Sequence, residues 1–380
     1  MSIRYLDNAA TTPVRREVLE AMTPYLTSHF GNPSSHHTIG EQAARALADA
    51  RARIAAVLGM RSTDIVFTSG ATEANNLAIK GVAIAAQQRR GARHIVTTPI
   101  EHESVLASID YLVRIHGFDA SLVPVDATGR VDPTAVADAL RDDTAIVSIG
   151  YANNEIGTVQ DVAGLVGAVG GRAPLHLDAV QAAGWLPLAA TGADAVSIAG
   201  HKIGAPKGIG VLGIRARIPL EPVLHGGGQE RERRSGTENV AGAVGLARAL
   251  ELAESERASG AARVAAMRDE LITGVLERIP VARLTGHPMH RLPGTASFTF
   301  AGVNGETVLL ELERRGLVTS SGSACAAGSD EASHVLLALG VPPDQARTAV
   351  RVTFGHDAEG SVAPIVDAIE AAVAAVRSGV

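Results

Sequence analysis

The chain has 380 residues, of which 46% are hydrophobic and 19% are charged, and its formal net charge is −6. This composition is typical of a globular protein with one large or two moderate domains. The sequence contains no polybasic run, so its charge does not indicate nucleic acid as a partner. No window approaches the ~18 apolar residues of a membrane-spanning helix, and the N-terminus lacks the apolar core of a signal peptide. We therefore expect a cytoplasmic protein without nucleic-acid or membrane partners.

Short apolar runs rich in Val and Ile recur through the first two-thirds of the chain, and helical patterns separate many of them. The predicted strands are residues 65–68, 94–97, 120–125, 145–149, 175–177, 195–199 and 210–214. The predicted helices include residues 41–58, 74–88, 133–140 and 162–169. Strands that alternate with helices predict an α/β fold with a mainly parallel seven-stranded sheet covered on both faces.

The pattern changes after three consecutive glycines at residues 226–228. A long helix is predicted at residues 239–276, followed by a smaller α+β unit. Its expected strands are residues 295–300 and 349–353, and its expected helices are residues 306–314 and 362–377. We predict a large domain of residues 13–255 and a small domain of residues 1–12 and 256–380.

Two strand ends carry the most informative residues. The strand at 195–199 runs directly into Gly200, His201 and Lys202, and the preceding strand ends at Asp178. In an open α/β sheet, the carboxyl ends of the strands border the ligand crevice. A lysine amine and a carboxylate held there are the groups that a pyridoxal phosphate (PLP) enzyme requires. A solvated or salt-bridged pair is the simpler alternative.

Other strand ends offer further polar groups. Gly70, Ala71 and Thr72 follow the first strand and open a helix, an arrangement that suits a phosphate ester; a plain helix start is the alternative. His102 follows the second strand and suits ring stacking or proton transfer. Asn154 lies in a turn beyond a later strand, where the Asn pair at 153–154 has a purely structural alternative.

The only cysteine, Cys325, rules out an intrachain disulfide and a Cys-rich metal site within one chain. It lies in a small, polar, glycine-rich loop at about 320–333, which fits chemistry better than packing. Arg351, on a predicted strand, suits a substrate carboxylate, with a surface salt bridge as the alternative. His36 and His37 lack acidic or Cys partners at ligand spacing, so we expect no bound metal.

Together these segments resemble the cysteine desulfurases, in the NifS/IscS branch of the class-V aminotransferase family of fold-type I PLP enzymes. The resemblance covers nearly the whole chain, and the order and number of its motifs make it specific. The motifs are residues 6–12, 31–35, 67–76, 101–102, 153–157, 176–181, 200–202, 226–239, 320–325 and 333–336.

The resemblance implies that Lys202 carries PLP and that several segments surround the cofactor. Around the ring they provide His102, which stacks on it, Asp178, which pairs with the pyridine nitrogen, and Asn154 and Gln181, which reach the phenolic oxygen. Around the phosphate they provide Ala71, Thr72 and His201, with Thr237 from the partner subunit of a homodimer.

The resemblance also implies a reaction. Asn32 and Arg351 would bind the carboxylate of L-cysteine, and Lys202 would move the Cα proton, with His102 as a further acid–base group. The thiolate of Cys325 would take the substrate sulfur as a persulfide and leave L-alanine. An acceptor protein would then receive the sulfur for iron–sulfur cluster assembly or thiolation. The cysteine loop looks like the longer form of the NifS/IscS branch.

One position departs from the family pattern. The family commonly has a serine that contacts phosphate three residues before the lysine, and this chain has Ala199. One neutral hydrogen bond is worth ~1 kcal/mol, so we expect weaker PLP retention at most.

Three alternatives remain: a selenocysteine lyase, an aminotransferase of the same fold and a non-catalytic docking protein of sulfur assembly. Cys325 argues against an aminotransferase, which needs no such nucleophile. The presence of Lys202, Asp178 and His102 together with Cys325 argues against a docking protein.

Overall fold

The computed structural model describes residues 3–322 and 332–378. Its main sheet consists of β2 (Ile65–Thr68), β3 (His94–Thr97), β4 (Asp119–Leu122), β5 (Thr144–Gly150), β6 (Leu175–Asp178), β7 (Ala195–Ala199) and β8 (Gly210–Ile214). The spatial order is β2-β8-β7-β6-β5-β3-β4. All pairs are parallel except those of β8, which runs antiparallel to β2 and β7. The predicted mainly parallel seven-stranded sheet is confirmed.

Most predicted strands have the predicted bounds or differ by a residue, because their Val and Ile residues are buried on both faces. The strand predicted at residues 120–125 is the exception, since β4 ends at Leu122. Val123 still donates to Thr97 O, at 2.8 Å. Beyond it, Val125 forms an isolated antiparallel bridge with Val131, so the chain no longer pairs with β3.

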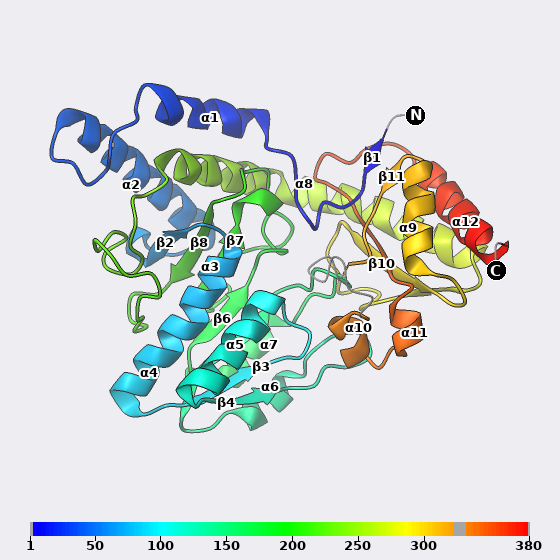
Figure 1. The fold of residues 1–380 in the computed structure, drawn as a ribbon, viewed down its shortest axis with the longest axis horizontal. Helices are drawn as coiled ribbons and strands as arrows, with labels where there is room; N and C mark the ends of the chain where they lie inside the picture. Colours follow the sequence, from blue (N-terminus) through cyan, green and yellow to red (C-terminus); the bar gives the residue numbers. More distant parts are fainter. Residues whose placement is uncertain (1–2, 323–331, 379–380) are drawn as a thin grey trace.

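Helices cover both faces of this sheet (Figure 1). They are α1 (Arg16–Thr27), α2 (Thr38–Leu58), α3 (Ala71–Asn76), α4 (Val82–Arg90), α5 (Glu103–His116), α6 (Pro133–Ala139), α7 (Val162–Val169) and α8 (Val240–Arg278). One core lies between the sheet and α1, α2, α6, α7 and α8, and the other lies between the sheet and α3, α4 and α5. A π-helical turn at Leu77–Gly81 joins α3 to α4, so the helix predicted at residues 74–88 begins earlier, at Ala71.

A second, smaller unit follows α8. Its antiparallel sheet has the order β12-β10-β9 and consists of β9 (Ala282–Leu284), β10 (Thr295–Phe300) and β12 (Val350–Thr353). The short strands β1 (Arg4–Tyr5) and β11 (Leu317–Val318) pair beside it in parallel. The helices are α9 (Gly305–Arg314), α10 (His334–Ala338), α11 (Pro343–Ala346) and α12 (Ala363–Ser378). The core contains Phe298, Phe300 and Phe354, and the N-terminal segment adds Leu6 to it.

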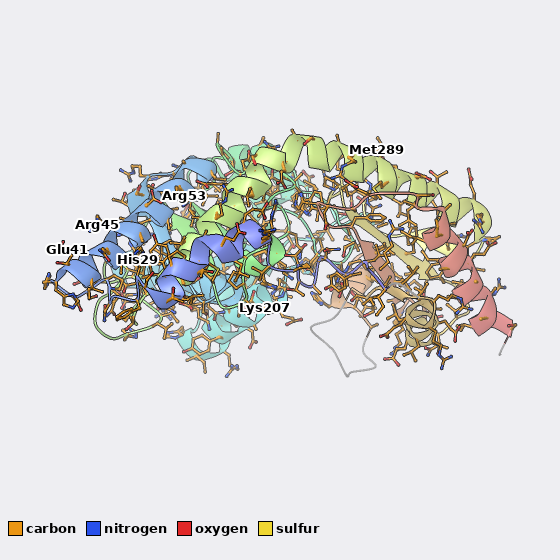
Figure 2. The ribbon with its side chains drawn as sticks, turned by 90° about the horizontal axis from the view of Figure 1, so that it is seen from above. His29, Glu41, Arg45, Arg53, Lys207 and Met289 are labelled. Atoms are coloured by element: carbon orange, nitrogen blue, oxygen red, sulfur yellow. The ribbon has the colours of Figure 1, made fainter. Side chains whose placement is uncertain are left out.

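The long helix α8 connects the two units (Figures 1 and 2). Its first part, up to Ala253, packs into the core of the main sheet, and its second part, from Val264, packs into the smaller core. The domain boundary near residue 255 stays a prediction, and the change of core along α8 supports it. No helix within the described ranges is long and apolar enough to cross a membrane.

The polar loop at residues 226–239 is fixed to the main sheet by a buried ion pair. Both Nη atoms of Arg51, on α2, donate to the Glu230 carboxylate, at 2.6 and 2.7 Å. The same carboxylate accepts a bond from Phe67 N, on β2, at 3.0 Å. Glu230, Arg231 and Glu232 all have positive φ values, a conformation that costs ~1–2 kcal/mol for each such residue. The ion pair therefore holds a strained segment in place.

We predict that Arg51→Met lowers the free energy of unfolding by about 3 kcal/mol or more, because it leaves the buried Glu230 carboxylate without its cation. Urea denaturation at fixed cofactor concentration measures the change. The double variant Arg51→Met/Glu230→Gln recovers part of the loss, since the uncompensated charge is gone.

Arg16→Met is the matched control, because Arg16 pairs with Glu20 in solvent, with side chains 88% and 61% exposed. An exposed pair of this kind is worth less than about 1 kcal/mol. Equal losses for Arg51→Met and Arg16→Met would contradict the role given to the buried pair.

Candidate active site

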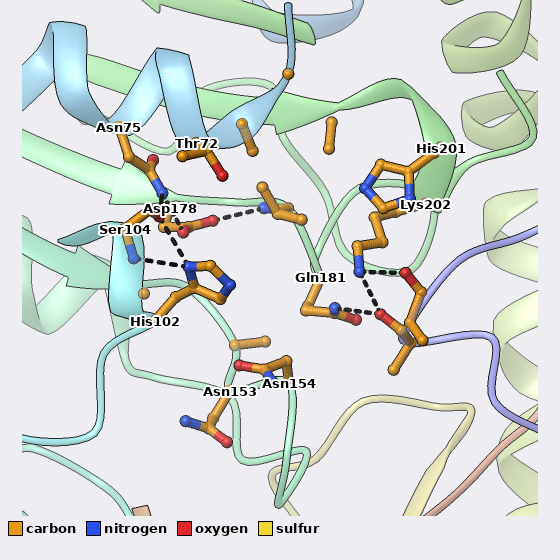
Figure 3. A pocket seen from close by; sticks show the side chains of 18 of the residues that line it. Thr72, Asn75, His102, Ser104, Asn153, Asn154, Asp178, Gln181, His201 and Lys202 are labelled. Atoms are coloured by element: carbon orange, nitrogen blue, oxygen red, sulfur yellow. Dashed lines mark hydrogen bonds between the residues drawn. The ribbon is translucent and has the colours of Figure 1, made fainter. Parts of the chain in front are cut away.

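The carboxyl ends of the parallel strands open onto a cavity of about 590 Å³. The cavity lining includes most of the site residues that the sequence predicts: Ala71, Thr72, His102, Asn154, Asp178, Gln181, His201, Lys202 and Arg351. Figure 3 shows many of these side chains around the pocket. All except Arg351 follow strands of the main sheet, and Arg351 comes from β12. The two units therefore both contribute to this site.

Lys202 ends a short 3-10 turn, Gly200–Lys202, directly after β7. Its Nζ donates to Ala9 O at 2.5 Å and to Ala10 O at 2.8 Å. Gln181 Nε2, in the turn after β6, donates to the same Ala9 carbonyl at 3.0 Å. The N-terminal segment thus lies beside the lysine amine and orients both side chains in the cavity.

Asp178 is the last residue of β6, and both of its carboxylate oxygens are hydrogen-bonded. Oδ1 accepts from Val180 N at 3.0 Å, and Oδ2 accepts from Asn75 Nδ2 at 2.7 Å. Asn75 Nδ2 also donates to Ser104 Oγ, which lies 2.8 Å from His102 Nδ1. A continuous set of contacts therefore connects Asp178 to the histidine (Figure 3).

A third part of the cavity suits an anion. Gly70, Ala71 and Thr72 form the turn from β2 into α3, and no side-chain cap occupies this helix start. Gly210, on β8, packs against it so closely that a Cβ there would lie 2.7 Å from the backbone of Gly70. His201 lines the same cavity, with Nδ1 at 3.2 Å from Thr11 Oγ1.

Burial and the nearby amines of Lys202 and Lys207 lower the pKa of His201 to about 4. In this structure the imidazole is neutral at pH 7, and its ring N–H can donate a hydrogen bond to a phosphate oxygen. Ala199 also lines the cavity and offers no hydroxyl. Lys202 and Lys207 also line the cavity.

The buried side chain of Arg351 contacts both the N-terminal segment and the turn after β5. Nη2 pairs with Asp7 Oδ1 at 2.6 Å, and Nη1 donates to Asn154 O at 2.7 Å and to Gly322 O at 3.3 Å. Nε is buried and has no hydrogen-bond partner among the residues that the structure describes. The alternative interpretation of Arg351, a surface salt bridge, does not describe this ion pair, because the Arg351 side chain is buried. The predicted contact with a substrate carboxylate stays a prediction.

The Asn pair after β5 divides between the two interpretations given above. Asn153 has the structural role, because its Oδ1 accepts from Glu155 N and Ile156 N and its Nδ2 donates to Ile100 O. Both asparagines line the cavity, and this position is what the predicted cofactor contact of Asn154 requires. The role of Asn154 stays a prediction.

Two predicted site residues, Asn32 and Thr237, do not line this cavity. Asn32 is exposed in the connection between α1 and α2, where its Oδ1 accepts from Ser34 N at 2.9 Å. Thr237 is exposed in the loop before α8, whose N-cap is Asn239. Cys325 lies outside the described residues. The roles predicted for these three residues remain predictions.

Sequence reasoning missed residues that contact the predicted ones. Asn75 and Ser104 are buried and polar, and each lies in the first turns of a helix that follows a strand of the sheet. Glu101 is also buried, lines the cavity and immediately precedes His102. Asn75 lies one helical turn after Ala71, and this spacing was the available signal.

The comparisons with known proteins agree with this geometry. The model of the class-V aminotransferase family matches residues 4–360. The chain belongs to the class-V aminotransferase family. It is 45% identical to the cysteine desulfurase IscS of Methanosarcina thermophila, over 93% of this chain and 87% of that protein. The cofactor of the chain is therefore PLP.

Solved structures give the same relationship. A NifS-like protein superposes with a TM-score of 0.90 at 36% identity, and all of each chain is covered. A structure described as SspA in complex with cysteine has a TM-score of 0.81 at 35% identity, over 92% of this chain and 98% of the other. The fold is thus that of the family.

The residues present fit PLP. A lysine amine, a hydrogen-bonded carboxylate, a histidine and an uncapped turn into a helix surround one cavity. Its volume of about 590 Å³ lies in the range usual for cofactor and ligand pockets. The buried and unpartnered Nε of Arg351 is a further donor at the same site.

Glu101 provides a pH-dependent property that the sequence did not predict. Burial raises the pKa of Glu101 to about 8, the Asp178 charge adds to the increase, and hydrogen bonds from Thr98 and Gly150 N oppose it. The folded protein therefore keeps a proton on Glu101 at pH values where the unfolded chain has lost it. Stability must fall as pH rises from about 4.5 toward 8.

We predict that Glu101→Gln removes part of this pH dependence, because glutamine has the shape of the neutral acid. Urea denaturation at pH 5.5 and pH 8 measures it, and the variant should gain on the order of a few kcal/mol relative to wild type at the higher pH. Glu103→Gln is the control, because the carboxylate of Glu103 lies close in the sequence and its side chain is largely exposed. The same pH dependence in wild type and Glu101→Gln would contradict the argument.

Proposed function

We propose that this chain is a PLP-dependent cysteine desulfurase that converts L-cysteine to L-alanine and leaves the sulfur as a persulfide on Cys325. The observation that carries the proposal is that Lys202, Asp178 and Arg351 line one cavity. The similarity to a cysteine desulfurase over 93% of the chain supports it, as does the relative solved in complex with cysteine.

Several residues would hold PLP, which, when bound, supplies an electron sink for the bonds at the Cα atom of an amino acid. Lys202 would bind it through its amine and later move the proton at the substrate Cα. Asp178 would accept a hydrogen bond from the pyridine nitrogen. The phosphate would lie against Ala71, Thr72 and His201, and His102, Asn154 and Gln181 would surround the ring.

Arg351 and Cys325 would act on the substrate itself. The Arg351 guanidinium would bind the carboxylate of L-cysteine, with Asn32 as a second contact. The Cys325 thiolate would form a bond to the substrate sulfur while the bond from that sulfur to Cβ breaks. The electron pair stays on carbon, which takes up a proton as L-alanine forms. Gly322, three residues before Cys325 in the sequence, lines the cavity, and this short connection supports the assignment.

The partners belong to the same proposal. We propose a homodimer in which Thr237 reaches the phosphate of the partner subunit. The exposure of Thr237 supports it, because an exposed side chain is accessible to a partner subunit. Arg234 of the same loop pairs with Glu73, in the first turn of α3, at 2.8 Å, which holds the loop beside the helix start. An acceptor protein for iron–sulfur cluster assembly or thiolation would receive the sulfur. A cytoplasmic location remains our proposal from the sequence.

We predict that Cys325→Ala loses nearly all release of alanine and sulfide from L-cysteine in the presence of a reductant. The cofactor absorbance should survive, because the cysteine is not among the residues proposed to bind PLP. Alanine and sulfide are measured for wild type and variant at equal cofactor content. Equal activity of both proteins would overturn the persulfide mechanism and indicate a lyase that releases sulfur directly.

A second prediction concerns Arg351→Lys, which keeps the charge but loses the planar guanidinium. We expect the affinity for L-cysteine to fall about tenfold or more, the value of a charge-assisted contact. Cysteamine, which lacks the carboxylate, should bind equally well to both proteins in titrations followed by cofactor absorbance. Arg347→Lys, at a nearby exposed position, is the control. Equal weakening of L-cysteine and cysteamine binding would show that Arg351 does not bind the substrate carboxylate.

A further inference from the structure

The contacts between Asp178 and His102 define a direction for each hydrogen bond. A carboxylate oxygen only accepts hydrogen bonds, so the Asn75 group that lies 2.7 Å from Asp178 Oδ2 must be its NH₂. The second hydrogen of this amide points to Ser104 Oγ, at 2.9 Å. The orientation of the buried Asn75 amide is therefore fixed by its neighbours, and within the described part of the chain its Oδ1 has no hydrogen-bond partner.

Ser104 lies between Asn75 and His102 and contacts both side chains. Because its hydroxyl oxygen accepts from Asn75, its own hydrogen is available for His102 Nδ1, at 2.8 Å. The backbone N–H of Ser104 also donates to His102 Nδ1, at 3.0 Å, since this histidine is the N-cap of α5. Two donors thus converge on one ring nitrogen.

A nitrogen that accepts an N–H bond carries no proton of its own, so the proton of the neutral ring lies on Nε2. Figure 3 shows this second ring nitrogen directed toward the open centre of the pocket. The side of His102 that faces the cavity is therefore an N–H group and not a lone pair.

We propose that Asn75 and Ser104 are positioning residues that hold His102 in the Nε2–H form, while Asn75 also fixes the carboxylate plane of Asp178. The inference rests on the proposed function for its mechanistic meaning. In the Nε2–H form, His102 would donate a hydrogen bond to negative charge on the sulfur of the bound substrate. It would not remove a proton through Nε2. Asn75 and Ser104 would thereby link the orientation of the Asp178 carboxylate to the orientation of the His102 ring.

The direct test is nuclear magnetic resonance of the substrate-free holoenzyme labelled with ¹⁵N-histidine. The His102 signals are assigned by their loss in His102→Gln. We expect a protonated Nε2 and a bare Nδ1 in wild type. A protonated Nδ1 would overturn the proposal. This measurement needs no turnover, so it stays informative even if the desulfurase activity itself is absent.

Variants then separate the two positioning residues. Ser104→Ala should shift the Nδ1 resonance and lower kcat about five- to tenfold, the value of one hydrogen bond, with KM and PLP affinity within twofold of wild type. Ser104→Thr keeps the hydroxyl, so its Nδ1 resonance and its kcat should match those of wild type. Asn75→Ala should shift the same resonance and also weaken PLP binding in absorbance titrations, because Asp178 loses a donor.

Ser108→Ala is the matched control. Ser108 is also buried on α5, and its hydroxyl donates to Ser104 O at 2.7 Å rather than to the histidine. We expect its Nδ1 resonance and kcat to match wild type. If Ser104→Ala and Ser108→Ala behave alike in both measurements, Ser104 has only a structural role and the proposal fails.

Discussion

Parallel strands place the carboxyl ends of distant segments at one edge of a sheet, and the site depends on this geometry. Asn75 and Asp178 are 103 positions apart in the chain, yet their side chains lie 2.7 Å apart because each follows a strand of the same sheet. The strands are buried on both faces, so their register is fixed by the packing of Val and Ile. An error of one residue in register would turn the strand side chains to the opposite face, and the core would select against it.

The N-terminal segment adds a second constraint. Through the carbonyls of Ala9 and Ala10 it contacts Lys202, and through Asp7 it contacts Arg351. Leu6 meanwhile packs into the smaller core. The proposed cofactor lysine and the proposed substrate arginine, which come from different sheets, are thus positioned against the same few residues. A shift of the smaller unit relative to the larger one would therefore move Arg351 and the lysine contacts together.

The sequence was sufficient for features that depend on local patterns. The strands from β5 to β8 are dense in Val and Ile, and the predicted residues at or after the ends of β5, β6 and β7 line the cavity, although their roles stay predictions. Short elements such as β9 and α10 escaped prediction, because tertiary pairing and not local preference decides them. Asn75 and Ser104 escaped for a related reason: each is an ordinary polar residue near a helix start, and only the fold brings them between Asp178 and His102.

The carboxyl groups of Glu101 and Asp178 both line the cavity, and their surroundings differ. Two nearby carboxylates resist simultaneous ionisation. Glu101 is fully enclosed, and burial raises its pKa to about 8, so it is neutral at pH 7. Asp178 instead has donors on both oxygens, from Val180 N and Asn75. The protonation of Glu101 therefore removes a competing charge, and the amide of Asn75 supports the carboxylate that remains. Both arrangements favour a single negative charge at the end of β6, and the proposed contact of Asp178 with the pyridine nitrogen requires such a charge.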